Sequence, residues 1–154
     1  MPDNDSNKPL TDLAFSSLEL LEPVQRGVVD AGFTHCTPIQ SLTLPSALNG
    51  CDVAGQAQTG TGKTAAFALP LLSRLDMTRR DPQVLVLTPT RELAIQVHKS
   101  FQDYGKYVGL RSTIVYGGVP MGPQEKDLLG GVEIVVATPG RLLDHAAVGL
   151  DADR

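Results

Sequence analysis

The sequence predicts an α/β fold, with a mostly parallel sheet flanked by helices. Four short apolar runs alternate with stretches whose apolar residues repeat at helical spacing, and this alternation favours a parallel sheet. The runs are continuous, as expected of strands covered by helices on both faces. At 154 residues the chain can bury one core, so we expect a single domain. The strands are expected at residues 53–54, 84–87, 113–116 and 134–137.

Two helices are expected before the first strand. Residues 18–31 have apolar residues at helical spacing, and Gly32 is a natural stop after them. A second helix is expected from Pro38 to about Asn49, with Thr37 as its N-cap and proline at the first helical position.

A glycine-rich loop follows the first expected strand and precedes a helix. Residues 57–64 read AQTGTGKT, a Walker A phosphate-binding loop with alanine at the first glycine position. Gly60 and Gly62 let the backbone turn tightly and aim N–H groups at phosphate oxygens. Lys63 would neutralise the β- and γ-phosphates, and Thr64 would offer its hydroxyl to Mg²⁺. The alternative is a glycine-rich turn that binds nothing. The residues expected to bind nucleotide here are Gln58, Thr59, Gly60, Thr61, Gly62, Lys63, Thr64 and Ala65.

The rest of the chain continues the alternation of helix and strand. Helices are expected over residues 63–75, 92–104 and 141–147, with a further one around 124–129. Open α/β sheets bind ligands at the edge where the strands end, so functional groups should lie along one rim. The loops at this rim are residues 56–62, 88–91, 117–118 and 138–141.

Composition excludes several functional classes. The chain is 42% hydrophobic, and no stretch is long and apolar enough to span a bilayer. A net charge of −4 argues against a broad basic face, although loops and helix N-termini can still contact phosphates. Residues 1–11 are polar, lack the features of a secretory signal and are expected to form a flexible tail before a domain over residues 12–154. Cys36 and Cys51 lack metal-ligand spacing and are interpreted as small packing residues in a reducing cytoplasm.

Four further segments contain recognisable sequence motifs, and these occur in a recognisable order. Residues 32–40 read GFTHCTPIQ, with Phe15 upstream. Later segments read PTRELA, GG and TPGR, at residues 89–94, 117–118 and 138–141. Together with the phosphate loop, these motifs resemble the first RecA-like domain of DEAD-box ATP-dependent RNA helicases, most of all bacterial ones, over residues 15–141. The resemblance implies a RecA-like P-loop NTPase fold.

The resemblance implies that residues 32–40 are a Q motif that recognises adenine. Phe15 would stack on the base, and Phe33, Thr37 and Gln40 would belong to the same nucleotide site. The chemistry of Gln40 supports this independently, because an amide has a donor and an acceptor end and can bond both N6 and N7 of adenine. Guanine inverts that pattern, so ATP should be preferred over GTP. The alternative for Gln40 is a polar residue on the surface of a helix.

The other motifs are implied to contact RNA. Residues 88–90 and 138–139 end strands and start helices, where hydroxyl and N–H groups suit a phosphate. Helix capping without a ligand is the alternative. The glycine pair is either a plain turn or a place where a nucleic-acid backbone approaches closely. Contacts to the sugar-phosphate backbone do not distinguish between bases, so RNA binding should be independent of base sequence. The expected RNA-binding residues are Pro89, Thr90, Arg91, Gly117, Gly118, Thr138, Pro139, Gly140 and Arg141.

The resemblance also implies an enzyme that hydrolyses ATP, with Lys63 and Thr64 as its catalytic residues in this chain. The 154 residues contain no Asp-Glu-Ala-Asp motif and no second RecA-like domain. We therefore expect a piece of a helicase, truncated at its C-terminus and inactive alone, whose sheet lacks central strands and exposes apolar edges. Two alternatives remain: another P-loop ATPase such as a DNA translocase, or a non-catalytic nucleotide-binding, RNA-binding or interaction module.

Overall fold

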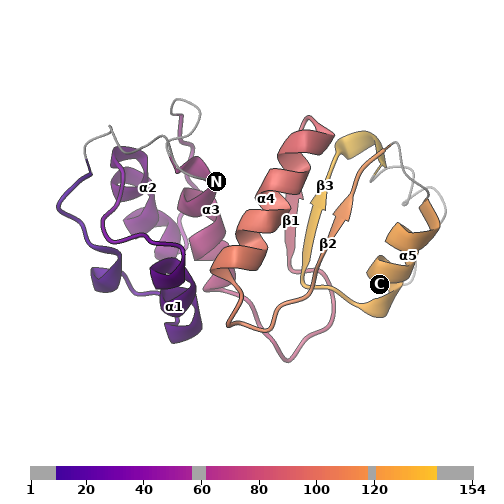
Figure 1. The fold of residues 1–154 in the computed structure, drawn as a ribbon, viewed down its shortest axis with the longest axis horizontal. Helices are drawn as coiled ribbons and strands as arrows, with labels where there is room; N and C mark the ends of the chain where they lie inside the picture. The colour runs from indigo at the N-terminus through magenta and orange to yellow at the C-terminus, as the bar shows by residue number, and fades with distance from the viewer. Residues whose placement is uncertain (1–9, 57–61, 118–120, 142–154) are drawn as a thin grey trace. The chain divides into compact units, whose positions relative to one another are not determined.

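The computed structural model describes residues 10–56, 62–117 and 121–141, which form two compact units (Figure 1). The first unit contains the described residues up to Arg74 together with residues 103–108. The second contains residues 75–102 and the described residues from Gly109 onward. Most of the predicted flexible tail lies outside the described residues. Among the helices described, none is long and apolar enough to cross a membrane.

The first unit is helical. It contains a 3₁₀ turn, η2 (Phe15–Ser17), and the helices α1 (Glu22–Asp30), α2 (Pro38–Leu48) and α3 (Lys63–Leu72). Helices α2 and α3 pack against each other. Large apolar side chains from all four elements are buried, namely Phe15, Val24, Val28, Leu44, Leu69 and Leu72.

Helix α1 begins later than the sequence predicted. A start at Leu18 would put Pro23 inside the helix, where proline lacks an N–H and its ring clashes with the carbonyl group four residues earlier. Because α1 begins at Glu22, Pro23 falls in the first turn, which tolerates proline. The predicted stop is confirmed, since Gly32 follows the helix with a left-handed φ of +86°.

Helix α2 follows its prediction closely. Thr37 is the N-cap and Pro38 the first helical residue, and the Thr37 N–H donates to Oε1 of Gln40 at 2.9 Å in a capping box. Helix α3 begins at Lys63 as predicted but ends at Leu72 instead of residue 75. The helix ends because the chain tightens into a turn in which the N–H of residue 74 donates to the carbonyl of residue 71.

The predicted strand at residues 53–54 is wrong. Residues 51–56 have no regular secondary structure, and Val53 is exposed. A strand is stable only when its N–H and C=O groups find a neighbouring strand, and none of the described strands pairs with these residues. A short apolar run does not supply that partner.

Residues 103–108 pack on α1 in the first unit. Nζ of Lys106 lies 2.8 Å from a carboxylate oxygen of Asp30, the Tyr107 hydroxyl bonds to the same oxygen, and the Arg26 guanidinium lies 4.3 Å from the centre of the Tyr107 ring. The hydrogen bonds from Lys106 and Tyr107 lower the pKa of Asp30. These contacts join the segment to the C-terminal half of α1.

The second unit is an α/β layer. Its elements are β1 (Val84–Leu87), α4 (Arg91–Tyr104, whose last two residues belong to the first unit), β2 (Ser112–Val115), α5 (Met121–Gly130) and β3 (Ile134–Ala137). The strands form one parallel sheet in the order β1-β3-β2. The α/β prediction is confirmed. Strand β2 lies one residue earlier than expected, since its register pairs Ser112 with Ile134.

Helix α5 covers part of one face of this sheet. Val115, Val132, Val135 and Ala137 form a buried apolar cluster, and Leu128 of α5 packs against it. The helix is longer at both ends than the predicted residues 124–129. The last predicted helix begins earlier than expected, since residues 139–141 are already helical, and its remainder lies outside the described residues.

Candidate functional site

The described part of the phosphate loop is the start of helix α3. Gly62 caps the helix with a left-handed φ of +78°, whereas residues 57–61, and with them Gln58, Thr59, Gly60 and Thr61, lie outside the described residues. Lys63 is exposed, Thr64 is half-buried and Ala65 is buried. The free N–H groups and the dipole at such a helix start favour an anion, and the Lys63 ammonium adds a full positive charge.

Gly62 is held by Gln40 from helix α2. Nε2 of Gln40 donates to the Gly62 carbonyl oxygen at 3.2 Å. A Cβ atom at position 62 would overlap Nε2 of Gln40, so glycine is required both for its φ angle and for this close approach. The candidate base-recognition residue and the phosphate loop are thus in direct contact.

Gln40 is completely buried, with both ends of its amide bonded within the protein. Its oxygen caps α2 at Thr37 and its nitrogen holds Gly62. The alternative of a polar residue on a helix surface is therefore wrong. An amide carries two donor hydrogens and two acceptor lone pairs, so each end keeps capacity for one more bond. Adenine recognition by Gln40 stays a prediction.

Phe15 lies in the core of the first unit and is only 2% exposed. Its ring centroid is 5.7 Å from that of Phe33, which in turn is 5.8 Å from that of Tyr104. The Phe15 N–H donates to the Thr34 carbonyl at 3.0 Å, which fixes the turn η2 beside the loop before α2. A base can stack on Phe15 only if this packing opens, so its predicted role remains untested.

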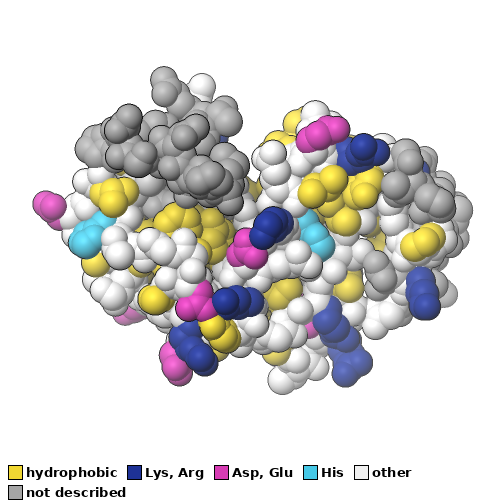
Figure 2. Space-filling view, viewed as in Figure 1, with side chains coloured by type: hydrophobic (Ala, Val, Ile, Leu, Met, Phe, Trp, Pro, Cys, Tyr) yellow, Lys and Arg dark blue, Asp and Glu magenta, His cyan; other side chains and the backbone are white. Residues whose placement is uncertain are grey.

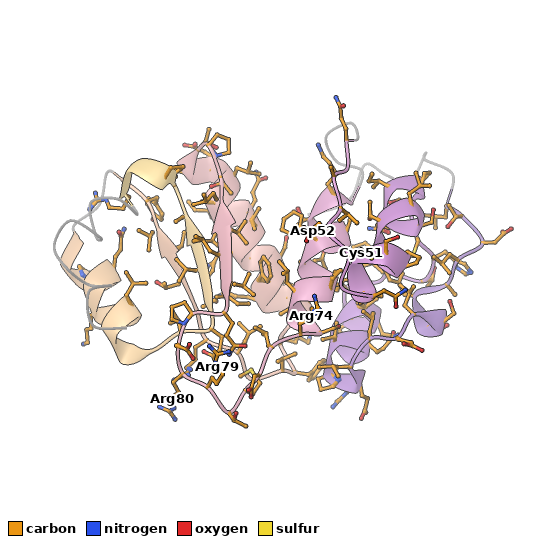
Figure 3. All side chains as sticks on the ribbon, turned by 180° about the vertical axis from the view of Figure 1, so that it is seen from behind. Cys51, Asp52, Arg74, Arg79 and Arg80 are labelled. Atoms are coloured by element: carbon orange, nitrogen blue, oxygen red, sulfur yellow. The ribbon has the colours of Figure 1, made fainter. Side chains whose placement is uncertain are left out.

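The two cysteines differ in environment. Cys36 is buried, and burial raises the pKa of its thiol to about 11, in keeping with the predicted packing role. Cys51 is exposed, so the same prediction is wrong for it. It follows Gly50, whose φ of +88° ends helix α2, and Figure 3 shows it close to Asp52 and Arg74. The described residues contain no cluster of side chains with which either cysteine could hold a metal.

The loops after the three strands lie at one edge of the second unit, as predicted for three of the four rim loops; most of the fourth, residues 56–62, lies outside the described residues. The Thr88 N–H donates to the Ala137 carbonyl at 2.9 Å, and the Thr138 N–H donates to the Val115 carbonyl at 2.9 Å. The strand ends are therefore joined across the sheet. Of the candidate RNA-binding residues, Pro89, Thr90, Arg91, Gly117, Pro139 and Gly140 are exposed, Thr138 and Arg141 are half-buried, and Gly118 lies outside the described residues.

Helix capping accounts for part of this rim. Oγ1 of Thr90 accepts a hydrogen bond from the Leu93 N–H at 3.2 Å, in the first turn of α4. Thr90 therefore caps helix α4, as the alternative interpretation of this threonine predicted. Capping and phosphate contact are compatible, because several N–H groups at the start of a helix have no partner within it.

Two residues that support the rim were not identified from the sequence. The Arg91 guanidinium lies 5.7 Å from the centre of the Tyr116 ring, and the Tyr116 carbonyl accepts a hydrogen bond at 3.0 Å from the buried amide of Gln124. The available signal was an aromatic residue directly before the glycine pair. Figure 2 shows basic side chains at several separate places on the visible face, some of them beside acidic ones.

The opposite edge of the second unit has a hollow of about 340 Å³, lined by Arg111, Ser112, Lys126, Gly130, Gly131 and Val132. Nε of Arg111 lies 3.2 Å from Oε2 of Glu133, which is 1% exposed. Nε2 of His98 lies 2.9 Å from the Ser112 hydroxyl. The arginine at this hollow is thus matched by a buried carboxylate.

Comparison with known proteins gives a consistent result. The sequence model of the DEAD/DEAH box helicase family matches residues 37–153. An ATP-dependent RNA helicase RhlB from Xanthomonas campestris pv. campestris (strain B100) is 53% identical over 158 residues, which cover 96% of this chain and 28% of that protein. An ATP-dependent RNA helicase DeaD from Mycobacterium tuberculosis (strain H37Rv) is 48% identical over 85% of this chain and 23% of its own length. The chain therefore spans about a quarter of these relatives.

Solved structures give the same picture. A DEAD box protein from the hyperthermophile Methanococcus jannaschii matches with a TM-score of 0.84 and 38% identity, over 90% of this chain and 38% of that one. A hypothetical ATP-dependent RNA helicase from Sulfolobus tokodaii matches with a TM-score of 0.75 and 41% identity, over 84% of this chain and 37% of its own. These matches confirm the predicted fold class.

Proposed function

Because this chain belongs to the DEAD/DEAH box helicase family, we propose that it carries the nucleotide-binding and RNA-contacting motifs of an ATP-dependent RNA helicase. The names of the matched relatives support this assignment. Since the chain spans only part of those relatives, unwinding and ATP hydrolysis are proposed for the whole protein. Residues 12–154 would be part of its first RecA-like domain, acting in the cytoplasm.

The observation that carries the proposal is the hydrogen bond between Gln40 and Gly62. It links the segment proposed to recognise the base with the loop proposed to hold the phosphates. The triphosphate would lie at the start of α3, which Gly62 opens with a left-handed φ of +78°. The N–H groups from Gln58 to Ala65 would face the phosphate oxygens.

Lys63 and Thr64 are the proposed catalytic residues of this chain. The exposed Lys63 ammonium would neutralise charge on the β- and γ-phosphates and on the transferred group. The Thr64 hydroxyl would hold Mg²⁺, which would offset the negative charge of the phosphates. A hydroxyl next to the loop lysine fits this oxygen-seeking ion.

The base would be read by the first unit. We propose that the remaining donor and acceptor of Gln40 bond N7 and N6 of adenine, with Phe15, Phe33 and Thr37 forming the surroundings. The burial of Phe15 and Gln40 means that base binding would be accompanied by an opening of this packing. Such a rearrangement would disturb the hydrogen bond between Gln40 and Gly62, and base binding would thereby affect the phosphate loop.

RNA would be held by the rim of the second unit through its sugar-phosphate backbone. Arg91 and Arg141 supply charge, and residues 89–90, 117–118 and 138–140 supply backbone and hydroxyl groups. The ends of the three strands are joined by hydrogen bonds, which would keep these groups in a fixed pattern. Binding of this kind depends on salt and is independent of base sequence.

The test is titration of the 154-residue chain with ATP and Mg²⁺, followed calorimetrically. Lys63→Ala should weaken ATP binding about tenfold or more while leaving the fold intact, because the β/γ charges lose their main side-chain partner. Lys126→Ala is the matched control, since it removes an exposed lysine from α5. Equal ATP affinities for the two folded variants would contradict the assignment of the phosphate loop.

A further inference from the structure

A cation–π contact joins the start of α4 to the end of β2. Arg91 is the first residue of α4, and Tyr116 directly follows β2. The Arg91 guanidinium lies 5.7 Å from the centre of the Tyr116 ring, within the roughly 6 Å over which an aromatic face attracts such a cation. Both residues belong to the second unit and lie in or beside the motifs that are proposed to hold RNA.

The contact between Arg91 and Tyr116 spans the end of β3. Strands β1 and β2 both pair with β3, which lies between them (Figure 1). Neighbouring strands lie about 4.8 Å apart, so the ends of β1 and β2 are separated by roughly 10 Å. Because Arg91 follows β1 and Tyr116 follows β2, their side chains together cross the end of β3. The contact therefore links the loops that follow β1 and β2.

The backbone at Tyr116 is held by hydrogen bonds. The Tyr116 carbonyl accepts a hydrogen bond at 3.0 Å from Nε2 of Gln124, a residue of α5 that is only 6% exposed. The preceding carbonyl, that of Val115, accepts a hydrogen bond from the Thr138 N–H at 2.9 Å. The half-buried Tyr116 ring therefore extends from a fixed backbone. A ring in this position can restrict a longer and more flexible side chain that packs on it.

The ring restricts Arg91 without cancelling its charge. Among the described carboxylates, none forms an ion pair with Arg91, whereas the Arg111 guanidinium pairs with Glu133. An aromatic face attracts a guanidinium through its quadrupole, which leaves the full positive charge available to an anion. A long arginine side chain loses rotamer freedom when it binds a ligand, and a contact that fixes it beforehand reduces this cost. The exposed Arg91 is thus a positive charge whose place at the rim is set in advance.

We propose that Tyr116 is a positioning residue for RNA binding, because its ring holds the Arg91 guanidinium where a backbone phosphate can bind it. This inference rests on the RNA-binding role proposed above for Arg91, and it requires no contact between Tyr116 and the RNA. The ring and not the hydroxyl should matter, since a cation–π contact needs only the aromatic face. Exposed cation–π contacts are weak, so loss of the ring should reduce the RNA affinity about two- to fivefold.

The experiment measures the affinity of the 154-residue chain for single-stranded RNA of mixed sequence by fluorescence anisotropy. Tyr116→Leu should bind the RNA about two- to fivefold more weakly than the unmodified chain, whereas Tyr116→Phe keeps the ring and should bind it equally well. Tyr107→Leu is the matched control, because it removes a ring that contacts Arg26 in the first unit, and it should leave the affinity unchanged. In an Arg91→Ala background, Tyr116→Leu should have no further effect, since there is no guanidinium left to position.

The unmodified chain gives a second readout that does not depend on the folding of the variants. NMR relaxation at the Nε atoms should show a more ordered side chain for Arg91 than for the exposed Arg80. Equal disorder at the two arginines would overturn the positioning role. The same holds if Tyr116→Phe binds RNA as weakly as Tyr116→Leu, or if Tyr116→Leu has the same effect with and without Arg91. If Arg91→Ala binds RNA no differently from the unmodified chain, the RNA-binding role of Arg91 is wrong, and the positioning role is overturned with it.

Discussion

The side-chain nitrogen of Gln40 donates a hydrogen bond to the carbonyl oxygen of Gly62 at 3.2 Å. This bond joins the first turn of α2 to the start of α3. Since the other end of the Gln40 amide caps α2 at Thr37, one buried side chain determines the conformation of both helix starts. Nucleotide selectivity and stability should therefore change together when Gln40 is replaced.

Gln40→Glu keeps the acceptor for the Thr37 N–H but replaces the donor to Gly62 with a carboxylate oxygen. The free energy of unfolding should fall by about 1–3 kcal/mol, because a buried acceptor loses its partner. ATP should lose its advantage over GTP, since the adenine N7 contact is lost. Urea unfolding and competition titrations measure the two effects. Gln96→Glu, at an exposed glutamine of α4, is the control; an unchanged preference for ATP would rule out base recognition by Gln40.

Arg91→Ala should weaken binding of single-stranded RNA by a similar factor for every sequence. It should also reduce the slope of log affinity against log salt by about one, as expected for the loss of one phosphate contact. Fluorescence anisotropy with two unrelated RNA sequences at several salt concentrations is the measurement. Arg80→Ala removes an exposed arginine near the opposite end of β1 (Figure 3) and should leave both quantities unchanged. A loss restricted to one RNA sequence would point to base readout instead.

Arg111→Ala should destabilise the second unit by roughly 1–3 kcal/mol. The Glu133 carboxylate is buried and would lose its charged partner. Glu133→Gln in the same chain removes the unpaired charge and should recover much of the loss. Urea unfolding of the two single variants and the double variant completes the cycle. Simple additivity of the two single effects would mean that the pair contributes nothing.

Stability should fall in mild acid because of His98. Desolvation lowers the pKa of this half-buried ring below its ordinary 6.5, and it outweighs a hydrogen bond with the Ser112 backbone, which acts to raise the pKa. In the unfolded chain His98 takes up a proton near pH 6.5, whereas in the folded chain it does so only at lower pH. The free energy of unfolding therefore decreases as the pH falls below about 6.5. His98→Gln should flatten the decline between about pH 7.5 and 5 in urea unfolding. His35→Gln, at an exposed histidine, should not flatten it.

Features that depend on local sequence were predicted well. The caps at Thr37 and Gly32 and the start of α3 at Lys63 follow from residue types at neighbouring positions, and all three were predicted correctly. The wrong start of α1 had a local cause too, because Pro23 marked it in the sequence. Errors of this kind concern boundaries and leave the elements themselves in place.

Features that depend on distant residues could not be predicted. Residues 53–54 looked like a strand, but a strand needs a neighbour, which no local pattern provides. The contact between Gln40 and Gly62 and the burial of Phe15 depend on how separate helices and turns pack. Sequence motifs were therefore sufficient to identify the candidate site residues, whereas the contacts of these residues could be determined only from the structure.

The strand order β1-β3-β2 has a consequence for how the second unit folds. Among the described strands, β1 and β2 do not pair with each other, and both pair with β3, the last of the three to be synthesised. The pairing of the described strands therefore cannot begin until residues 134–137 have been synthesised, and until then β1, with the exposed Leu85 and Leu87, has no described pairing partner. Pairing between segments so far apart in sequence is slow, because a long loop must close first. We therefore expect the nascent chain to be most prone to aggregate just before β3 is synthesised.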